Sequence, residues 1–341
     1  MIKDNKGGTG GKGMRGDSLL GLLLVVVLAL VFHYWGDTKE DGTPPVQPAV
    51  PEQQAQANTS VSGKEIPETG PAVRFLMQNV ENYFVEGERT RSRYVSSPKP
   101  VAARNAVAKG ISDQAPDIIG LVEVGGEVSL NDLRSRLSKM GREYPYYRVL
   151  EREGEERALA VLSRHPIVQD HSTADYPLYG EQNRKMLRGI LDVVVKVPDG
   201  RLFRIIGAHL KSHVADDEAA ADSLRQREAI TLSMYLQKIS REQPGIPTLI
   251  YGDWNDGPGT PAIKQMEQGV SKDAAMKRLE PTDARGEGWT IYYKAGKEYL
   301  TYDMIFVNKV LQSRMKRAKM GVAPPTPKHA SDHRAVWCEL H

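Results

Sequence analysis

Cysteine is nearly absent from this chain of 341 residues, in which Cys338 is the only one. A single thiol cannot form a disulfide within the chain, so a domain outside the cytoplasm would be stabilised by its hydrophobic core alone. Internal repeats are absent from the sequence as well. The length fits one large domain or two ordinary ones.

Charged side chains are missing from Ser18 to Gly36, and Leu19–Phe32 is almost purely leucine, valine and alanine. As a helix, these 19 residues would reach about 28 Å, close to the roughly 30 Å core of a bilayer. His33-Tyr34-Trp35 follows, where a signal peptide would have small residues before its cleavage site. The sequence therefore predicts an uncleaved transmembrane anchor. A cleaved signal peptide is the main competing interpretation, and a buried core helix fits poorly because polar, proline-rich sequence follows.

The anchor divides the chain into four predicted segments. Residues 1–17 form a short leader, residues 18–36 the anchor, residues 37–71 a flexible tether rich in proline, glutamine and alanine, and residues 72–341 a folded domain. Lysine and arginine in the leader predict a cytoplasmic N-terminus and a folded domain outside the cytoplasm, in the periplasm or the extracellular space. The net charge is +3 overall, +2 in the leader and −4 in the tether, which leaves +5 for the folded domain. This mild excess is compatible with a polyanionic substrate but does not demonstrate one.

Short apolar runs alternate with helical patterns in the folded domain. Helices are expected at Val101–Gln114, Leu130–Met140 and Asp217–Ile239. Several expected strands adjoin one another without a helix between them, and Pro198-Asp199-Gly200 predicts a hairpin turn between two of them. The pattern predicts a mixed α/β protein with antiparallel strand pairs. The expected strands are Val73–Met77, Ile118–Val122, Tyr146–Leu150, Ala158–Leu162, Met186–Val197, Leu202–His209, Thr248–Tyr251, Tyr302–Val307 and Ala335–Leu340.

Polar residues recur where these strands begin or end. A charged side chain in an apolar strand is costly unless it is paired or binds a metal, so several such positions favour one shared site. Carboxylates, amides and histidines gathered in this way suit a hard divalent cation and the hydrolysis of phosphate esters. The residues are Asn79, Glu123, His209, Asp253, Asn255, Asp303, Asp332 and His333.

Two familiar metal motifs do not fit. His209 and His213 are four residues apart, but no glutamate follows His209 and the segment has a strand pattern, which argues against a helical zinc motif. A calcium loop beginning at Asp253 would have Pro258 at its sixth position and Lys264 at its twelfth, which excludes an EF-hand.

The order of these segments resembles the endonuclease/exonuclease/phosphatase superfamily, the deoxyribonuclease I-like fold. One such segment would be weak evidence, whereas six in family order and at family-like spacing are strong evidence. The resemblance spans essentially all of residues 73–341 and implies a four-layered α/β sandwich, in which two central mixed or antiparallel sheets are flanked by helices. It is carried by Gln78–Asn82, Pro116–Glu123, Ala208–Ser212, Gly252–Asp256, Tyr302-Asp303 and Ser331–His333.

The resemblance also implies a metal and a catalytic base. Glu123 is the expected ligand of Mg²⁺, with help from Asn79 and Asp332, and Mn²⁺ and Ca²⁺ are the alternative ions. His333 is the expected general base or phosphate contact, and Asp303 would orient its ring and stabilise its cationic form.

Further roles follow from the same resemblance. Asp253 would orient the attacking water, and Asn255 would hydrogen-bond the scissile phosphate. His209 would stabilise the transition state or assist the leaving group. Arg188 stands where the family often has a phosphate-contacting arginine, and a surface salt bridge is the alternative interpretation.

Three departures from the family pattern leave these groups in place. Arg157-Ala158 replaces a polar element that some nucleases use near the phosphate, Trp254 stands where phenylalanine is commoner, and Tyr302-Asp303-Met304 replaces the usual Asp-Tyr-hydrophobic order. A basic run from Arg314 to Lys319 is by default a solvated face, with a groove for a substrate backbone as the alternative.

The resulting expectation is a membrane-tethered, metal-dependent phosphoesterase that hydrolyses phosphodiester bonds of DNA or RNA. A nucleic acid is the expected partner, the membrane is contacted through the N-terminal helix, and no protein partner is indicated. Hydrolysis of a phospholipid head group, as by a sphingomyelinase, or of a phosphorylated small molecule is the alternative activity. An inactive scaffold or binding module is the alternative of another class.

Overall fold

The computed structural model of this chain describes residues 70–86, 97–181, 183–213, 217–294, 296–326 and 330–341. All of these residues belong to one compact unit, Ala57–His341. The predicted leader, anchor and nearly all of the tether, residues 1–69, lie outside the described residues. Within the described ranges, none of the helices combines the length and the apolar character needed to cross a bilayer.

One six-stranded sheet contains both the first and the last strand of the unit. Its order is β13–β14–β1–β2–β4–β3. β1 is parallel to β2 and antiparallel to β14, so the sheet is mixed. Both of its faces are covered, which explains why most residues of β1 and β2 are buried. The strands are β1 (Val73–Tyr83), β2 (Ile118–Val124), β3 (Tyr146–Arg152), β4 (Glu155–Ser163), β13 (Met320–Val322) and β14 (Val336–Leu340).

A second six-stranded sheet packs on the first and has the order β5–β6–β7–β8–β12–β9. β6 and β7 form the predicted hairpin, whose turn contains Gly200 with a positive φ of 95°. β7 and β8 are parallel, and β12 is antiparallel to β8. The strands are β5 (Ile167–Asp170), β6 (Leu191–Lys196), β7 (Leu202–His209), β8 (Thr248–Asp253), β9 (Lys277–Arg278) and β12 (Asp303–Val307).

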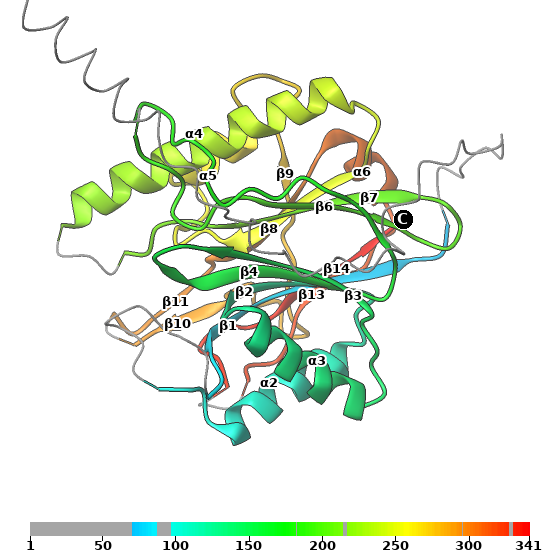
Figure 1. The fold of residues 1–341 in the computed structure, drawn as a ribbon. Helices are drawn as coiled ribbons and strands as arrows, with labels where there is room; N and C mark the ends of the chain where they lie inside the picture. Colours follow the sequence, from blue (N-terminus) through cyan, green and yellow to red (C-terminus); the bar gives the residue numbers. More distant parts are fainter. Residues whose placement is uncertain (1–69, 87–96, 182, 214–216, 295, 327–329) are drawn as a thin grey trace, which may run out of the picture. The chain divides into compact units, whose positions relative to one another are not determined.

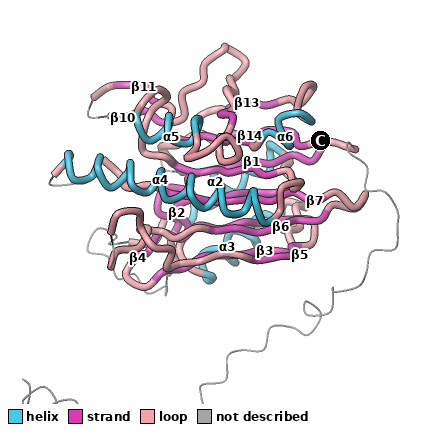
Figure 2. The backbone as a smooth tube through the Cα atoms, turned by 90° about the horizontal axis from the view of Figure 1, so that it is seen from above, coloured by secondary structure: helices cyan, strands magenta, loops and turns pink. Residues whose placement is uncertain are grey.

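Helices cover the outer face of each sheet and complete four layers (Figure 1). α2 (Val101–Gln114) and α3 (Glu127–Lys139) pack on the first sheet, and α4 (Glu218–Glu242) and α5 (Pro261–Gln268) on the second. α4 begins where the side chain of Asp217 accepts the N–H of Ala220 at 3.0 Å, a standard N-cap. The predicted four-layered sandwich of two sheets flanked by helices is therefore confirmed. The backbone tube in Figure 2 shows the strands of the two sheets running in similar directions.

Tyr251 joins the two sheets at the centre of the fold. Its buried ring comes from β8 of the second sheet, and its hydroxyl donates to the carbonyl oxygen of Ala160 on β4 of the first, at 2.8 Å. Two glycines leave room for the ring, because a Cβ at Gly120 would lie 2.6 Å from Tyr251 Cε2 and one at Gly207 would lie 2.7 Å from its hydroxyl. Tyr251 thereby fixes the spacing of the sheets two residues before Asp253.

We expect Gly120→Ala to destabilise the fold, because its methyl group would enter the space of the Tyr251 ring. Overpacking of this kind lowers the free energy of unfolding by about 1–3 kcal/mol. Denaturant titration measures it, with Gly245→Ala as the matched control, since a Cβ at Gly245 would have no neighbour within 4 Å. Equal stability of the two variants would contradict the role given to Tyr251.

A two-stranded hairpin lies outside both sheets. It consists of β10 (Ile291–Tyr293) and β11 (Glu298–Leu300), which pair antiparallel with Tyr292 opposite Tyr299. A single bridge between Ile291 and His333 joins it to the segment that precedes β14. Figure 1 shows the hairpin at the left of the two sheets.

The predicted elements were largely correct, with one clear error. Helix Val101–Gln114 has the predicted bounds, whereas the expected strand Met186–Val197 begins only at Leu191. The backbone turns away at Gly189, where φ is +68° and the Cβ of any other residue would lie 2.4 Å from the carbonyl oxygen of Thr173. The apolar residues before this turn therefore belong to a loop that carries Arg188.

Candidate active site

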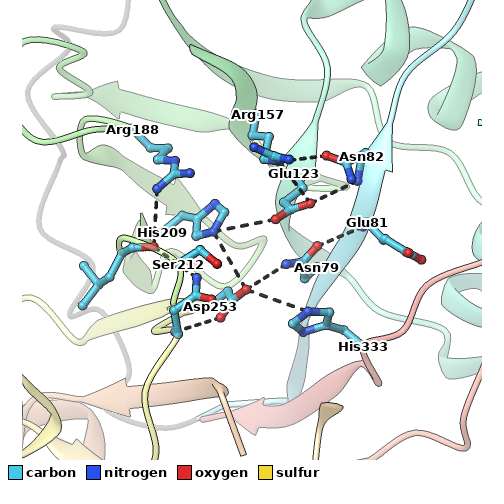
Figure 3. A network of polar contacts seen from close by, with 12 residues as sticks. Asn79, Glu81, Asn82, Glu123, Arg157, Arg188, His209, Ser212, Asp253 and His333 are labelled. Carbon is cyan, nitrogen blue, oxygen red and sulfur yellow. Dashed lines mark hydrogen bonds and ion pairs between the residues drawn. The ribbon is translucent and has the colours of Figure 1, made fainter. Parts of the chain in front are cut away.

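Strands from both sheets end at one shared edge, and their polar residues meet there (Figure 3). In the second sheet His209 and Asp303 each pair with Asp253, so strand register alone places these three residues side by side. The first sheet contributes Asn79 from β1 and Glu123 from β2. The site is thus a product of the packing of one sheet on the other.

Asp253 lies at the centre of this cluster and is buried. Its Oδ2 accepts a hydrogen bond from Asn79 Nδ2 at 2.9 Å, and its Oδ1 accepts the N–H of Asn255 at 2.9 Å. The Nε2 atoms of His209 and His333 both lie 3.9 Å from Oδ2. One carboxylate therefore faces both histidines. Burial raises the pKa of Asp253, and the Asp303 and Glu123 carboxylates add to this effect while His333 opposes it.

His333 and Asp303 form a short, buried pair. The imidazole Nδ1 donates to Asp303 Oδ2 at 2.6 Å, which leaves Nε2 free to exchange a proton. Burial by itself lowers the pKa of His333, but the Asp303 carboxylate and then Asp253 raise it well above its ordinary value. Thr290 Oγ1 accepts the N–H of Asp303 at 3.0 Å, so the backbone that carries this carboxylate is fixed as well. This is the arrangement predicted for a general base and its orienting carboxylate.

His209 differs from His333 in that its pKa is lowered instead of raised. It is buried, and burial followed by the charge of Arg188 lowers its pKa well below the ordinary value, so the ring is neutral. Its Nε2 lies 3.8 Å from Glu123 Oε1. Within the described ranges its Nδ1 has no hydrogen-bond partner. A neutral imidazole here can form hydrogen bonds without adding charge to the site.

Glu123 interrupts β2 with a positive φ of 63°, at an irregularity in the pairing of β2 with β4. Its Oε2 accepts the N–H of Asn82 at 3.2 Å and lies 3.5 Å from Arg157 Nε. The backbone irregularity turns the side chain toward the shared edge, where an ordinary strand position would bury it in the sheet. This accounts for a charged residue inside an apolar run.

The donor set fits a hard divalent cation. One oxygen or nitrogen from each of Glu123, His209 and Asp253 lies within 4.8 Å of the other two, and the same holds for Asp253, Asp303 and His333. A buried carboxylate whose pKa is raised by burial and by two neighbouring carboxylates, as for Asp253, is an arrangement that a bound cation stabilises. One oxygen of Asp303, Oδ1, is buried and without a hydrogen-bond partner in the described part of the chain.

Two of the three predicted metal ligands, Asn79 and Asp332, are less well positioned than Glu123 to bind a metal. Asn79 Oδ1 accepts the N–H of Glu81 at 2.9 Å, so its amide oxygen is already engaged. Asp332 is exposed, its N–H is bound by Glu81 Oε2 at 3.1 Å, and its Oδ1 lies 3.7 Å from His333 Nε2. Asp332 belongs to neither three-residue group found among the described residues. Asp253 and His209, assigned to other roles from the sequence, are the residues that share a possible metal group with Glu123.

The remaining predicted residues line the other side of the site. Arg188 is buried, its Nη1 donates to the carbonyl oxygen of Leu210 at 3.4 Å, and its Nε lies 3.1 Å from Glu155 Oε2. Arg188 thus forms the salt bridge that was the alternative interpretation, but it does so in a buried position and not at the surface. Asn255 has a positive φ of 48° and donates from Nδ2 to the carbonyl oxygen of Leu210 at 3.1 Å.

Sequence reasoning gave no role to three residues found at or beside this site. Arg157 Nε donates to Asn82 Oδ1 at 2.8 Å beside Glu123, and Lys99 is buried with Nζ 3.9 Å from Glu81 Oε2. Glu228 on α4 is buried and accepts the N–H groups of Leu187 and Lys211, at 3.0 Å and 2.8 Å. It therefore links the Arg188 loop to the end of β7. The only signal for Glu228 was a charged residue within the apolar stripe of the predicted helix.

The basic run from Arg314 to Lys319 lies away from this edge. Met320, next to Lys319, pairs with Cys338, which in turn pairs with Phe75 near the start of β1, whereas Asn79 lies toward the end of that strand. Its exposed lysines therefore fit a solvated face better than a substrate groove at the active site.

Two packed mixed sheets with a site of carboxylates and histidines at their shared edge define the class of deoxyribonuclease I-like α/β sandwiches. The model of the endonuclease/exonuclease/phosphatase family matches residues 79–333, and the chain belongs to this family. The match begins at Asn79 and ends at His333, so it spans the whole set of predicted site residues.

Solved structures show the same fold at low sequence identity. Beta toxin from Staphylococcus aureus has a TM-score of 0.59 at 19% identity, over 78% of this chain and 99% of that chain. A variant of the toxin with bound magnesium ions has a TM-score of 0.55 at 18% identity, over 79% and 99%. An endonuclease/exonuclease/phosphatase from Bacteroides vulgatus has 0.57 at 18%, over 80% and 99%. Sphingomyelinase C from Streptomyces griseocarneus has 0.54 at 15%, over 80% and 100%. No curated protein matches the chain significantly in sequence.

Proposed function

We propose that this protein is a divalent-metal-dependent phosphodiesterase that hydrolyses nucleic acid by in-line attack of water. Membership of the family supports a hydrolase acting on phosphate esters. The observation that carries the proposed mechanism is the position of Asp253 between two histidines whose pKa values are shifted in opposite directions. His333 has a raised pKa and a carboxylate partner, whereas His209 is neutral and faces Glu123.

Each residue has a distinct part in this proposal. Glu123 and Asp253 would hold Mg²⁺, with Asn79 and Asp332 at the margin, and the ion would neutralise charge on the phosphoryl oxygens. His333 accepts the proton of the attacking water at Nε2 while Asp303 keeps the other ring nitrogen protonated. Asp253 orients that water. His209, Asn255 and Arg188 contact the phosphate oxygens or the leaving group, since all three lie at the ends of β7 and β8 or in the adjoining loop.

Charge supports a polyanion as the substrate. Arg157 and Arg188, and more weakly Lys211, lie near enough to His209 for their charges to lower its pKa. Residues 72–341 carry a net +5 once the +2 leader and the −4 tether are subtracted from +3. Cationic side chains beside a candidate metal site suit a substrate with several phosphates in a row. A phospholipid or a phosphorylated small molecule would use the same catalytic groups and is the alternative.

Nicking of supercoiled plasmid by the purified full chain tests the proposal. The expected result is nicking with Mg²⁺ and none with EDTA. Cleavage of sphingomyelin in mixed micelles without plasmid or oligonucleotide cleavage would replace the nucleic-acid assignment with the lipid one. Absence of metal-dependent hydrolysis of every phosphodiester offered, including bis(4-nitrophenyl) phosphate, would favour an inactive binding module.

We also propose that residues 18–36 anchor this activity to a membrane with the folded unit outside the cytoplasm. The support is the uncharged run of 19 residues behind a leader that contains four lysines and arginines. Retention of the full chain in the membrane pellet after alkaline carbonate extraction is the expected result. Release of a shortened chain would indicate signal-peptide cleavage.

The His333–Asp303 pair predicts a specific pH dependence. His333 must lose its proton to act as a base, and the Asp303 carboxylate holds the pKa of His333 above its ordinary value. kcat/KM should therefore rise with pH as His333 deprotonates. Asp303→Asn removes the charge that favours the imidazolium, so the acid limb of the profile should move to lower pH while the plateau falls. An acid limb that stays in place in Asp303→Asn would contradict the assignment of this titration to His333.

A further inference from the structure

Hairpin β10–β11 and the segment just before it carry a cluster of aromatic rings at the protein surface. Tyr292 and Tyr299 face each other across the two strands with ring centroids 4.8 Å apart, and the ring of Trp289 lies 4.7 Å from that of Tyr299. Tyr299 is 63% exposed. Of these three adjoining rings, Tyr299 lies largely in solvent, whereas Trp289 and Tyr292 are half-buried and the Arg334 guanidinium lies over the Trp289 ring, with Cζ 4.2 Å from its centroid. We call Trp289, Tyr292 and Tyr299 the aromatic face.

The root of this hairpin is fixed to the candidate catalytic pair. Ile291 forms a bridge with His333, and Thr290 Oγ1 accepts the N–H groups of Tyr302 and Asp303 at 3.1 and 3.0 Å. Because Tyr292 follows Ile291 directly, the aromatic face begins roughly one strand residue, about 3.3 Å, beyond the position paired with His333. A substrate whose phosphate is attacked beside His333 would thus place its neighbouring group close to these rings.

The hairpin's chemistry favours a nucleotide base over a lipid chain. Its turn carries the exposed residues Lys294, Gly296 and Lys297, with Glu298 as the opposing charge, and residue 295 is outside the described ranges. A hairpin that inserts into a bilayer needs an apolar tip, whereas here the described tip is cationic. Tyrosine and tryptophan rings stack on the faces of bases, and lysines contact the phosphates that link them.

We propose that the aromatic face binds an unpaired base next to the scissile phosphate, so that the enzyme prefers single-stranded nucleic acid. Bases in a duplex are stacked and paired, and their faces are not accessible to Trp289, Tyr292 or Tyr299. This inference rests on the proposed function for its phosphate site. It adds a specificity surface, formed by the hairpin, that makes no contact with the reacting atoms.

Binding measurements separate this proposal from catalysis. Fluorescence anisotropy with a labelled single-stranded oligonucleotide uses the full chain carrying His333→Ala in Mg²⁺, which prevents turnover. Adding Tyr299→Ala should weaken binding about tenfold or more, because stacking on an aromatic side chain contributes this much per base. Tyr299→Phe should retain the affinity, since it keeps the ring. Tyr179→Ala removes another tyrosine, 50% exposed, and serves as the matched control.

The substrate series identifies what the rings contact. An oligonucleotide with abasic sites keeps the phosphates but has no base to stack, so it should bind weakly and lose nothing further in Tyr299→Ala. Equal losses on the normal and abasic strands, or equal affinity of the variant and its control, would overturn the proposal. So would a selective loss of activity on phospholipid micelles in Tyr299→Ala. If the protein hydrolyses bis(4-nitrophenyl) phosphate but binding does not depend on Tyr299, only this inference fails. If no phosphodiester is hydrolysed, the proposed function fails independently of the binding result.

Discussion

Replacement of His333 by alanine is expected to lower kcat by about 10³-fold or more on any phosphodiester that the protein hydrolyses. The imidazole is the one group at the site that combines a free ring nitrogen, Nε2, with a carboxylate on the other nitrogen, Asp303 Oδ2 at 2.6 Å. General base catalysis contributes about 10²- to 10⁴-fold, and the variant also leaves the buried Asp303 without its partner. Single-turnover hydrolysis of bis(4-nitrophenyl) phosphate measures the chemical step.

His171→Ala is the matched control for this prediction. His171 is exposed, and its Nε2 lies 3.2 Å from Gln169 Oε1, in the segment that follows β5. Its removal should leave kcat unchanged. Thermal denaturation of both variants distinguishes lost chemistry from lost folding. A His333→Ala protein that is folded and still hydrolyses at the wild-type rate would remove His333 from the mechanism and leave the neighbouring Asp253 as the candidate base.

Glu123→Gln should weaken metal binding and lower activity at a fixed Mg²⁺ concentration by about 10²-fold. The carboxylate belongs to the group in which Glu123, His209 and Asp253 offer atoms within 4.8 Å of one another, and an uncharged amide is a much poorer ligand for a hard cation. Much of the lost activity should return at higher Mg²⁺ concentration. That recovery would separate a ligand from a group that takes part in proton transfer.

Thermal stability tests the role of Glu123 in metal binding without a measurement of enzymatic activity. Binding of Mg²⁺ to the folded state alone raises Tm, so the wild-type protein should be more stable with Mg²⁺ than with EDTA. In Glu123→Gln this difference should shrink, while Glu242→Gln, a change on the exposed end of α4, should preserve it. An unchanged Mg²⁺-dependent rise in Tm would mean that the ion binds elsewhere, with Asp253, Asp303 and His333 as the other candidate group.

Much of the site could be predicted from sequence because its residues end apolar runs. Asp253 and His209 follow strands of the same sheet, and register then determines that they meet. Glu123 was visible as an acid within an apolar run. What the sequence could not show was the backbone irregularity that turns Glu123 outward, or the hydrogen bond from Asn79 to Asp253 across the two sheets. Both depend on packing between strands far apart in the chain.

The loop from Met186 to Gly189 was the main structural misinterpretation. Its apolar residues continue the pattern of the following strand, and a single glycine gave too weak a signal for a turn. The structure shows that a positive φ at Gly189 and the contacts of Arg188 with Leu210 and Glu155 end the strand. Glu228 was missed for a related reason, since a buried carboxylate that binds two loop N–H groups has the sequence signature of an ordinary helical glutamate.

The solitary thiol of Cys338 offers a built-in reporter of global opening. It is buried in β14, between β1 and β13, and burial raises the pKa of this thiol, so the reactive thiolate is suppressed in the folded state. A thiol-specific reagent should therefore label the native chain only as fast as the first sheet opens. Because Cys338 is the only cysteine, labelling would follow that opening without an engineered probe. Comparing its rate with the rate of inactivation would show whether the catalytic edge is lost before the sandwich separates or together with it.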